Sequence, residues 1–475
     1  MKKYLALFLG VLFVLSFAAS AFAIHAEIPS ETQAVVAAKD IQITLGGEIR
    51  TRGWFLNNIN DLREPSHTLF NGEEGGRTKS TAYYDERVRL SLDAKVSPGV
   101  EGFVMLETTN GDINSQTKDV YVWGSLNNKP GADFTPGSTF QINEAWILYS
   151  GSGLFGFNSG LKIGHMPLAL GEKQFFDHTK FGDDAIVFFM QPTKALHVAL
   201  LTFKGHEAFV TDGTDFFSTP GGKPGISGNG ADLDAYVALA TYALDDKNTV
   251  GVNYTFINQP NSTDEFGFST KAELKFQDLS LHANGNIAGL GYKAEADMQF
   301  GSTLDDDGDK LDFKGYGIML GLNYNINPLN LRASAAYGSG SKSTDDADIK
   351  NFVTFLGADQ HYTLVYDYNV VTAAGSTATG ISNTTYFNLG ADYAATKELT
   401  ASLDGYYLRA SKTDSGISKN VGWEVDARVA YQLAKNLSYV VDAGYLKAGN
   451  FYRDTNSGFD KASATVLKHT LTLSF

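Results

Sequence analysis

The sequence ends on TVLKHTLTLSF, residues Thr465 to Phe475, and this stretch decides the fold. One set of alternate residues is apolar and the other is polar: Leu467, Leu471, Leu473 and Phe475 against Lys468, Thr470, Thr472 and Ser474. A period of two residues is typical of a β-strand with two different faces. Terminal residues of soluble domains usually fray in water. Because the alternation continues to the carboxylate, we expect its apolar face to contact a hydrophobic surface.

The same alternation recurs along the chain, as in TVGVNYTFI (249–257), YKAEADMQF (292–300) and WEVDARVAY (423–431). The composition agrees with many strands joined by tight turns, since the chain has 49 Gly, 32 Phe and 23 Tyr but only 11 Pro and no Cys. Apolar residues make up 43% of the chain and are dispersed rather than gathered in long runs. These features predict an all-β fold.

The apolar faces of these strands predict contact with lipid. After residue 23 the sequence has no apolar run of the ~18 residues that a spanning helix needs. A closed β-barrel is the other structure that satisfies its backbone in a bilayer. A β-sandwich would also alternate. Aromatic residues near the ends of the apolar faces, such as Tyr292 and Phe300 or Trp423 and Tyr431, favour the membrane barrel with its aromatic girdles.

Connections between the expected strands alternate between short and long. The short ones contain turn residues and lie at Ser97 to Gly99, Gln191 to Lys194, Asn327 to Asn330 and Ala434 to Asn436. The long polar ones cover roughly 57–79, 111–137, 204–232 and 338–382. Short periplasmic turns and long extracellular loops are typical of outer-membrane barrels.

Both ends of the barrel are expected on the periplasmic side, which requires an even number of strands. We count eighteen, the first near Ile41 to Phe55 and the last near Ala464 to Phe475. Sixteen and twenty are the alternatives, because 268–287 could hold one extended strand or two.

The N-terminus has the pattern of a secretory signal peptide over residues 1–23, with Lys2 and Lys3 before an apolar core and an A-x-A site at Ala21 to Ala23. Without the two lysines the formal charge changes from −15 to −17, and such an acidic chain is a poor nucleic-acid binder. Residues 24–40 are expected as a periplasmic segment, with a capping box at Ser30 to Gln33 that predicts a short helix up to Ala38. Residues 41–475 form the predicted barrel, in the outer membrane of a Gram-negative cell.

Three stretches resemble a known family. They are LKIGHMPLALGEKQFFDHTKFGDDAIVF (161–188), YKAEADMQFG (292–301) and GWEVDARVAYQLAKNLSYVVDAGYLKAG (422–449), and the last is similar to a penultimate hairpin. Together they resemble alginate-export-like outer-membrane porins, which implies a monomeric pore of eighteen strands. Two departures argue against alginate itself as the solute. The family usually carries Arg-Gln where this chain has His165-Met166, and the chain has only ten Arg, although alginate exporters have an arginine-lined lumen.

The polar faces of the strands predict a lumen of mixed charge. The basic candidates are Arg50, Arg52, Arg87, Arg89, Lys95, Lys293, Arg332, Arg428 and Lys468. The acidic candidates are Glu48, Asp85, Asp93, Glu101, Glu107, Glu295, Asp297, Asp392, Asp404, Glu424, Asp426 and Asp442. Nine against twelve disfavours a phosphate-type anion pore, which needs a dominant basic array.

Closure of the barrel would gather these charges on two neighbouring walls. The basic wall comprises Arg50, Arg52, Arg87, Arg89 and Lys468, and the acidic wall comprises Asp392, Asp404, Glu424, Asp426 and Asp442. One hypothesis is a transverse field that orients small polar solutes. The alternative is that the charges neutralise one another as structural ion pairs.

Two further segments are candidate sites. The segment from Leu170 to Asp184 would either fold inward as a constriction or pack its aromatics on the rim, and it carries Glu172, Phe175, Phe176, Asp177 and His178. Asp305, Asp307 and Asp309 offer alternate carboxylates, as Ca²⁺ prefers, but no Glu completes the loop, and a solvated acidic tip is the competing interpretation. No cofactor motif and no catalytic constellation is present, because the sequence lacks H-E-x-x-H and C-x-x-C-H spacings.

These observations predict a passive channel for small hydrophilic solutes or ions. Its partners would be the outer-membrane lipids and the barrel insertion machinery, since the final Phe475 resembles an assembly signal. The alternative is a structural barrel that houses or anchors a partner such as a cytochrome or an exported polymer. Inward positions with small or polar side chains, Gly251, Asn253, Gly317, Gly321, Asn323 and Gly390, suggest open space and favour the channel.

Overall fold

The computed structural model describes residues 34–38, 41–59, 63–64, 80–109, 121–123, 139–153, 155–206, 232–260, 273–304, 308–342, 348–357, 361–367, 379–453 and 460–475. The expected signal peptide and most of the expected long loops lie outside these residues. Within the described residues, no helix has the length and apolar character needed to cross a membrane.

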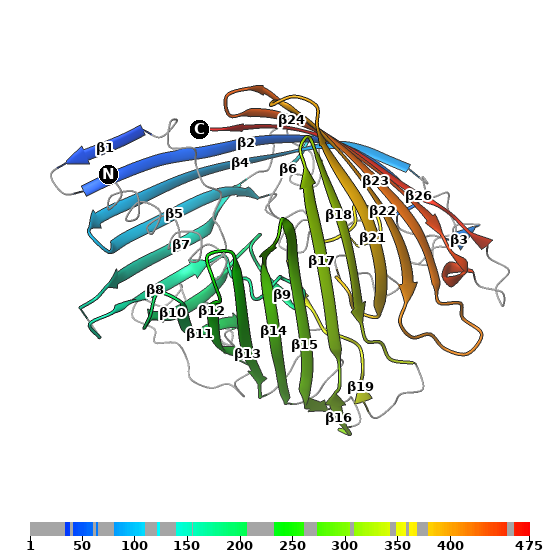
Figure 1. Cartoon of the computed structure of the whole chain (residues 1–475), viewed down its shortest axis with the longest axis horizontal. Helices are drawn as coiled ribbons and strands as arrows, with labels where there is room; N and C mark the ends of the chain where they lie inside the picture. Colours follow the sequence, from blue (N-terminus) through cyan, green and yellow to red (C-terminus); the bar gives the residue numbers. More distant parts are fainter. Residues whose placement is uncertain are drawn as a thin grey trace, which may run out of the picture.

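Long antiparallel strands form a closed barrel (Figure 1). Each strand pairs with its neighbours in order, and the last, β26, pairs with both β24 and the first strand, β2. The described residues therefore form an eighteen-stranded barrel, as predicted. The strands are β2 (Ile41–Asn57), β4 (Ser80–Ser97), β5 (Val100–Thr109), β7 (Thr139–Gly151), β8 (Asn158–Met166), β10 (Asp183–Gln191), β11 (Leu196–His206), β12 (Leu233–Ala243), β13 (Asn248–Gln259), β14 (Leu274–Ile287), β15 (Leu290–Leu304), β17 (Tyr316–Ile326), β18 (Leu329–Gly338), β21 (Thr384–Ala394), β22 (Leu399–Ala410), β23 (Asn420–Ala434), β24 (Leu437–Ala448) and β26 (Ala464–Ser474).

The described part of the ambiguous region 268–287, residues 273–287, contributes one strand to the barrel. Leu274–Ile287 is continuous, and it pairs with β13 on one side and with β15 on the other. The short turns also lie where the sequence predicted them, as at Ser97 to Gly99 between β4 and β5.

The C-terminus closes the barrel. The amide of Gly47 donates to the Phe475 carbonyl at 2.7 Å, and the Phe475 amide donates to the Gly47 carbonyl at 3.0 Å. Phe475 also lies over Gly47, where a Cβ would be 2.7 Å from the ring atom Cζ. The last residue is thus held by backbone bonds on its neighbour strand, and Figure 1 shows the red C-terminal strand beside the blue β2.

The outer surface of the barrel is apolar. Large side chains that alternate along the strands point outward, and Leu389, Ile147 and Met298 are 73%, 67% and 62% exposed. Exposing such an apolar band to water would be unfavourable, whereas in a membrane lipid covers it. The alternation noted in the sequence is therefore the difference between a lipid face and an inner face.

The inner face is not polar all round. On β10 to β12 it carries buried apolar side chains, namely Val187, Ala199, Leu201, Phe203, Ala235, Val237 and Leu239. Both faces of these strands are apolar, which hides the period of two. The inner apolar residues pack against chain segments that fold into the barrel.

Several short elements are not among the eighteen barrel strands. β1 (Ala34–Ala38) pairs antiparallel with the first residues of β2, so the predicted helix ending at Ala38 is wrong for these residues. The backbone of β1 instead bonds to the part of β2 that extends past β26. The others are β3 (Arg63–Glu64), β6 (Tyr121–Val122), β9 (Phe176–Asp177), β16 (Lys310–Phe313), β19 (Asp348–Ile349), β20 (Phe355–Leu356), β25 (Asp460–Lys461) and the 3-10 turn η1 (Asn450–Tyr452).

Candidate functional site

The first inward segment, residues 167–182, connects β8 to β10 and lies inside the barrel. The amide of Glu172 donates to a carboxylate oxygen of Glu295, an inner-face residue of β15. Asn284 Nδ2 of β14 donates to Glu172 Oε1 at 2.7 Å. Gly171 has a φ of +53° where the chain passes close to Glu295, so a side chain here would be strained. The structure thus places Glu172 and its neighbours in the lumen and not on the rim.

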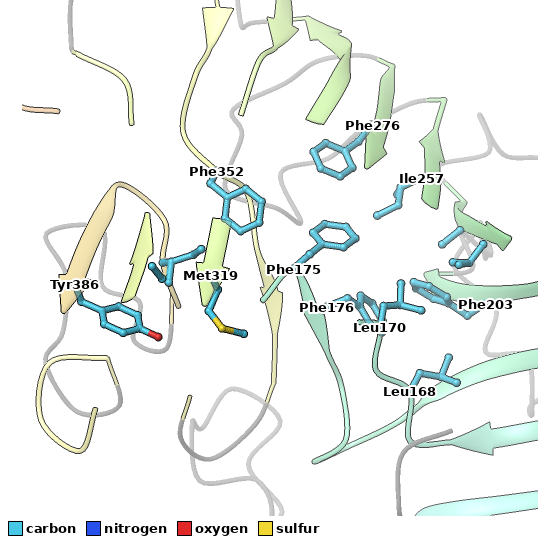
Figure 2. Packing of buried hydrophobic residues seen from close by; sticks show 14 of the residues in the cluster. Leu168, Leu170, Phe175, Phe176, Phe203, Ile257, Phe276, Met319, Phe352 and Tyr386 are labelled. Atoms are coloured by element: carbon cyan, nitrogen blue, oxygen red, sulfur yellow. The ribbon is translucent and has the colours of Figure 1, made fainter. Parts of the chain in front are cut away.

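Aromatic side chains fill the space between this segment and the wall. Phe175 stacks on Phe276 of β14 with ring centroids 5.8 Å apart, and Phe176 lies 5.2 Å from Phe203 of β11. Both phenylalanines are 1% exposed. Figure 2 shows them among Phe203, Phe276 and Phe352. A small hydrophobic core therefore occupies part of the lumen.

The other two predicted residues of this segment make local contacts. Asp177 Oδ1 accepts from the amide and the hydroxyl of Thr179, at 3.1 and 2.7 Å. His178 Nδ1 lies 2.9 Å from Asp183 Oδ1. These bonds fix the return of the chain towards β10.

A second inward segment, residues 348–357 and 361–367, comes from the long connection between β18 and β21. Its strand β20 pairs with β9, so the two inward segments are joined to each other. Gln299 of β15 binds Val353 twice, donating to its carbonyl and accepting from its amide at 2.8 Å each. Phe352 is fully buried over Gly317 of β17. This region was predicted from the sequence as part of a long extracellular loop, and its inward path was not predicted.

Two residues of the predicted acidic wall hold this second inward segment. Glu424 accepts from the amides of Val365 and Tyr366 at 2.6 and 2.9 Å, and Asp426 accepts from the amide of Leu364 at 3.0 Å. Consecutive amides that point at carboxylates form charge-assisted hydrogen bonds. Glu424 and Asp426 are therefore occupied by backbone donors in this structure.

Asp367 ends this part of the segment and is 3% exposed. Burial raises the pKa of Asp367 to about 7, although the Gly380 amide, which donates to Oδ1 at 2.8 Å, opposes the rise. The titratable groups that interact with it are Tyr362 and Tyr366 of its own segment and Tyr386 of β21.

The predicted basic wall assembles on β2, β4 and β26, but its charges face carboxylates. Arg52 Nε lies 2.8 Å from Asp85 Oδ1, which is buried with it. Further ion pairs join Arg87 to Glu48 at 2.6 Å, Arg87 to Glu107 at 3.8 Å, Arg89 to Glu107, and Lys468 to Asp442 at 3.1 Å. Arg50 lies opposite Arg87 in the register of β2 and β4. This arrangement favours ion pairs over an uncompensated transverse field.

The remaining acidic wall residues also meet bases. Arg332 of β18 donates to Asp392 at 2.9 Å and to Asp404 at 2.7 Å. Asp442 lies 3.6 Å from Arg428 and close to Lys468.

A cavity of about 830 Å³ occupies the half of the lumen nearest the short turns. The two inward segments close it on the side away from the short turns, through Glu172, Gln174, His361, Tyr362 and Leu364. Its walls come from the inner faces of β14 to β24, and most side chains on them are polar, including Asn284, Lys293, Asn323, Asn330, Arg332, Asn388, Asp392, Asp404, Asp426, Arg428 and Asp442.

The inward glycines mark this open space only in part: Gly321 lines the cavity, whereas the prediction is wrong for Gly317 and Gly390. A Cβ on Gly317 would meet the Phe352 ring at 3.0 Å, and one on Gly321 would meet Lys293 Cγ at 2.9 Å. Gly390 lies under Asp404. Gly251 is likewise covered by His282. Gly251, Gly317 and Gly390 are therefore covered by neighbouring side chains.

The acidic tip that could suit Ca²⁺ lies mostly outside the described residues, which contain Asp309 but neither Asp305 nor Asp307. Among the residues that the structure describes, no three His, Cys, Asp or Glu side chains are arranged to hold a metal ion.

Comparison with known proteins agrees with this barrel. Residues 236–463 match the family described as alginate export. This match covers just under half of the chain, and the described residues have the closed-barrel fold of outer-membrane porins. Among solved structures, OccK5 (OpdH) and OccK9 (OpdG) of Pseudomonas aeruginosa both have a TM-score of 0.52, with 12% and 13% identity. OpdK of the same organism, solved with vanillate, has a TM-score of 0.51 and 10% identity. In each case 91% of this chain and 98% of the other are covered. No curated protein matches the chain.

Proposed function

We propose that this alginate-export-like barrel is a monomeric outer-membrane channel for the passive diffusion of small hydrophilic solutes or ions. The observation that carries the proposal is the polar cavity of about 830 Å³ inside a closed barrel with an apolar outer surface. A polar interior inside a lipid-facing wall is the arrangement that a water-filled pore requires.

The two inward segments give the channel its selectivity. They narrow the lumen on the side of the long loops, where Phe175 and Phe352 pack against the wall. Solutes therefore pass beside the aromatic core and reach the cavity below it. The size of the passage depends on how firmly the segments are held.

Recording from the purified full chain in a planar bilayer tests the proposal. We expect stepwise conductance, and we expect larger steps for Phe352→Ala, which removes a buried ring from the second inward segment. Phe300→Ala is the matched control, because Phe300 is on the lipid-facing side of β15 and its loss should leave the step size unchanged. Folded, inserted protein that shows no steps would contradict the channel.

The second candidate function is a structural barrel that houses or anchors a partner. The aromatic core inside the lumen favours it, since Phe175, Phe176, Phe276 and Phe352 fill space that a wide pore would leave to water. Under this alternative, Phe352→Ala would also lack conductance.

A further inference from the structure

Several polar atoms on the cavity wall have no hydrogen-bond partner among the described residues. They are Asp426 Oδ1, Asn330 Oδ1, His361 Nε2 and Tyr362 OH. The first two can only accept hydrogen bonds, and the other two can accept as well as donate. Buried polar groups normally find partners. The unused acceptors therefore point to a ligand that brings N–H or O–H donors.

The charge of the cavity wall is negative. Five carboxylates and three bases line it, so the formal sum is 3 − 5 = −2: Glu172, Asp392, Asp404, Asp426 and Asp442 against Lys293, Arg332 and Arg428. Arg332 is held between Asp392 and Asp404, which leaves this group with a charge of −1. A carboxylate on a solute would have to compete with Asp392 and Asp404 for the guanidinium of Arg332.

Aromatic faces lie beside the carboxylates. Tyr362 of the second inward segment stacks on Tyr386 with ring centroids 4.5 Å apart, and Tyr406 lies edge-on at 6.5 Å. Tyr406 and Asp404 alternate on β22, where they face Glu424 and Asp426 of β23 in register. A cation near an aromatic face gains electrostatic attraction from the ring. Carboxylates and tyrosine rings together suit an organic cation.

We propose that this cavity binds small organic cations that carry ammonium or guanidinium groups, with Asp404 and Asp426 as counter-charges beside the tyrosine rings. The proposal rests on the channel function and names its substrate class. The cation donates to the unused oxygens of Asp426 and Asn330, while its alkyl part lies along Tyr362 and Tyr406.

Two probes of equal carbon number and opposite charge test this proposal on the reconstituted full chain. Pentane-1,5-diamine should block the single-channel current at a concentration at least about tenfold below that of glutarate, as expected for a difference near 1.4 kcal/mol. Asp426→Asn should raise the half-blocking concentration of the diamine about fivefold, the factor for losing one unit charge about 4 Å away in water. Because Asp426 also holds the Leu364 amide, Asp404→Asn is a second variant and should have the same direction of effect.

Asp245→Asn is the matched control, because Asp245 lies in the exposed turn between β12 and β13 and its neutralisation should leave the block unchanged. Equal or stronger block by glutarate would overturn the proposal. So would unchanged block in both Asp404→Asn and Asp426→Asn. If no conductance is seen, the channel function fails, and calorimetry with pentane-1,5-diamine on the folded protein then tests the cavity alone. Heat of binding that Asp404→Asn weakens would support the cation site, and no heat would overturn it.

Discussion

Replacing Glu424 with Ala should release the second inward segment from the barrel wall. Glu424 is fully buried and accepts from the amides of Val365 and Tyr366 at 2.6 and 2.9 Å. The Ala variant leaves both amides without this acceptor, and each unsatisfied buried group costs about 1–3 kcal/mol. The docked state should therefore lose about 2–6 kcal/mol relative to the released state.

Hydrogen–deuterium exchange of the reconstituted protein measures this change. Since each 1.4 kcal/mol is a factor of ten, exchange at Val365 and Tyr366 should become about 30-fold faster or more. Glu424→Gln keeps one side-chain carbonyl acceptor and should show a smaller increase. Glu101→Ala is the control, because Glu101 belongs to β5, which pairs with β4 and β7 and not with the strands that hold the segment. Exchange at these amides that is equal in Glu424→Ala and Glu101→Ala would refute the assigned role.

Three other perturbations have defined outcomes. Because the pKa of Asp367 is raised to about 7, its contribution to docking is complete below about pH 4 and is lost as the pH rises through 7. Exchange in residues 361–367, corrected for the intrinsic rate, should rise between about pH 4 and 7, and Asp367→Asn should abolish the rise; a rise that persists in the variant would assign it elsewhere. Deletion of Phe475 should reduce the amount of inserted barrel, seen by surface labelling, more than the conductance of inserted molecules, because it removes both bonds to Gly47; equal surface levels would contradict this. Arg52→Gln leaves Asp85 buried without its ion pair and should lower the stability by about 3–5 kcal/mol in a denaturant titration, whereas an unchanged midpoint would show that the pair is not stabilising.

The fold could be predicted from the sequence because a barrel wall repeats a local pattern. Each residue of Leu290–Leu304 faces either lipid or lumen, so Met298 and Asp297 show their sides by parity alone. Counting strands between the short turns gave eighteen, and the family resemblance implied the same number. Parity gave no such information on β10 to β12, where both faces are apolar, as Val187 and Ile186 show on β10.

The candidate site was predicted only in part. The segment containing Phe175 was identified, but the choice between rim and lumen depends on a partner far away in the chain, Phe276. Parity predicted the acidic pair Glu424 and Asp426 on the inner face, but gave no sign of their role as acceptors for backbone amides. No signal in the sequence of residues 361–367 indicates where their amides go.

The sequence by itself determined the alternating strands, their closure through the final Phe475, and the excess of acidic over basic inner residues. These properties follow from each strand's two faces and from its immediate neighbours. The tertiary structure alone decided which charges are paired, which glycines are covered, and where space is left in the lumen. Those outcomes depend on two inward segments whose contacts span more than a hundred residues, as between Glu172 and Glu295, and such pairings leave no local period in the sequence.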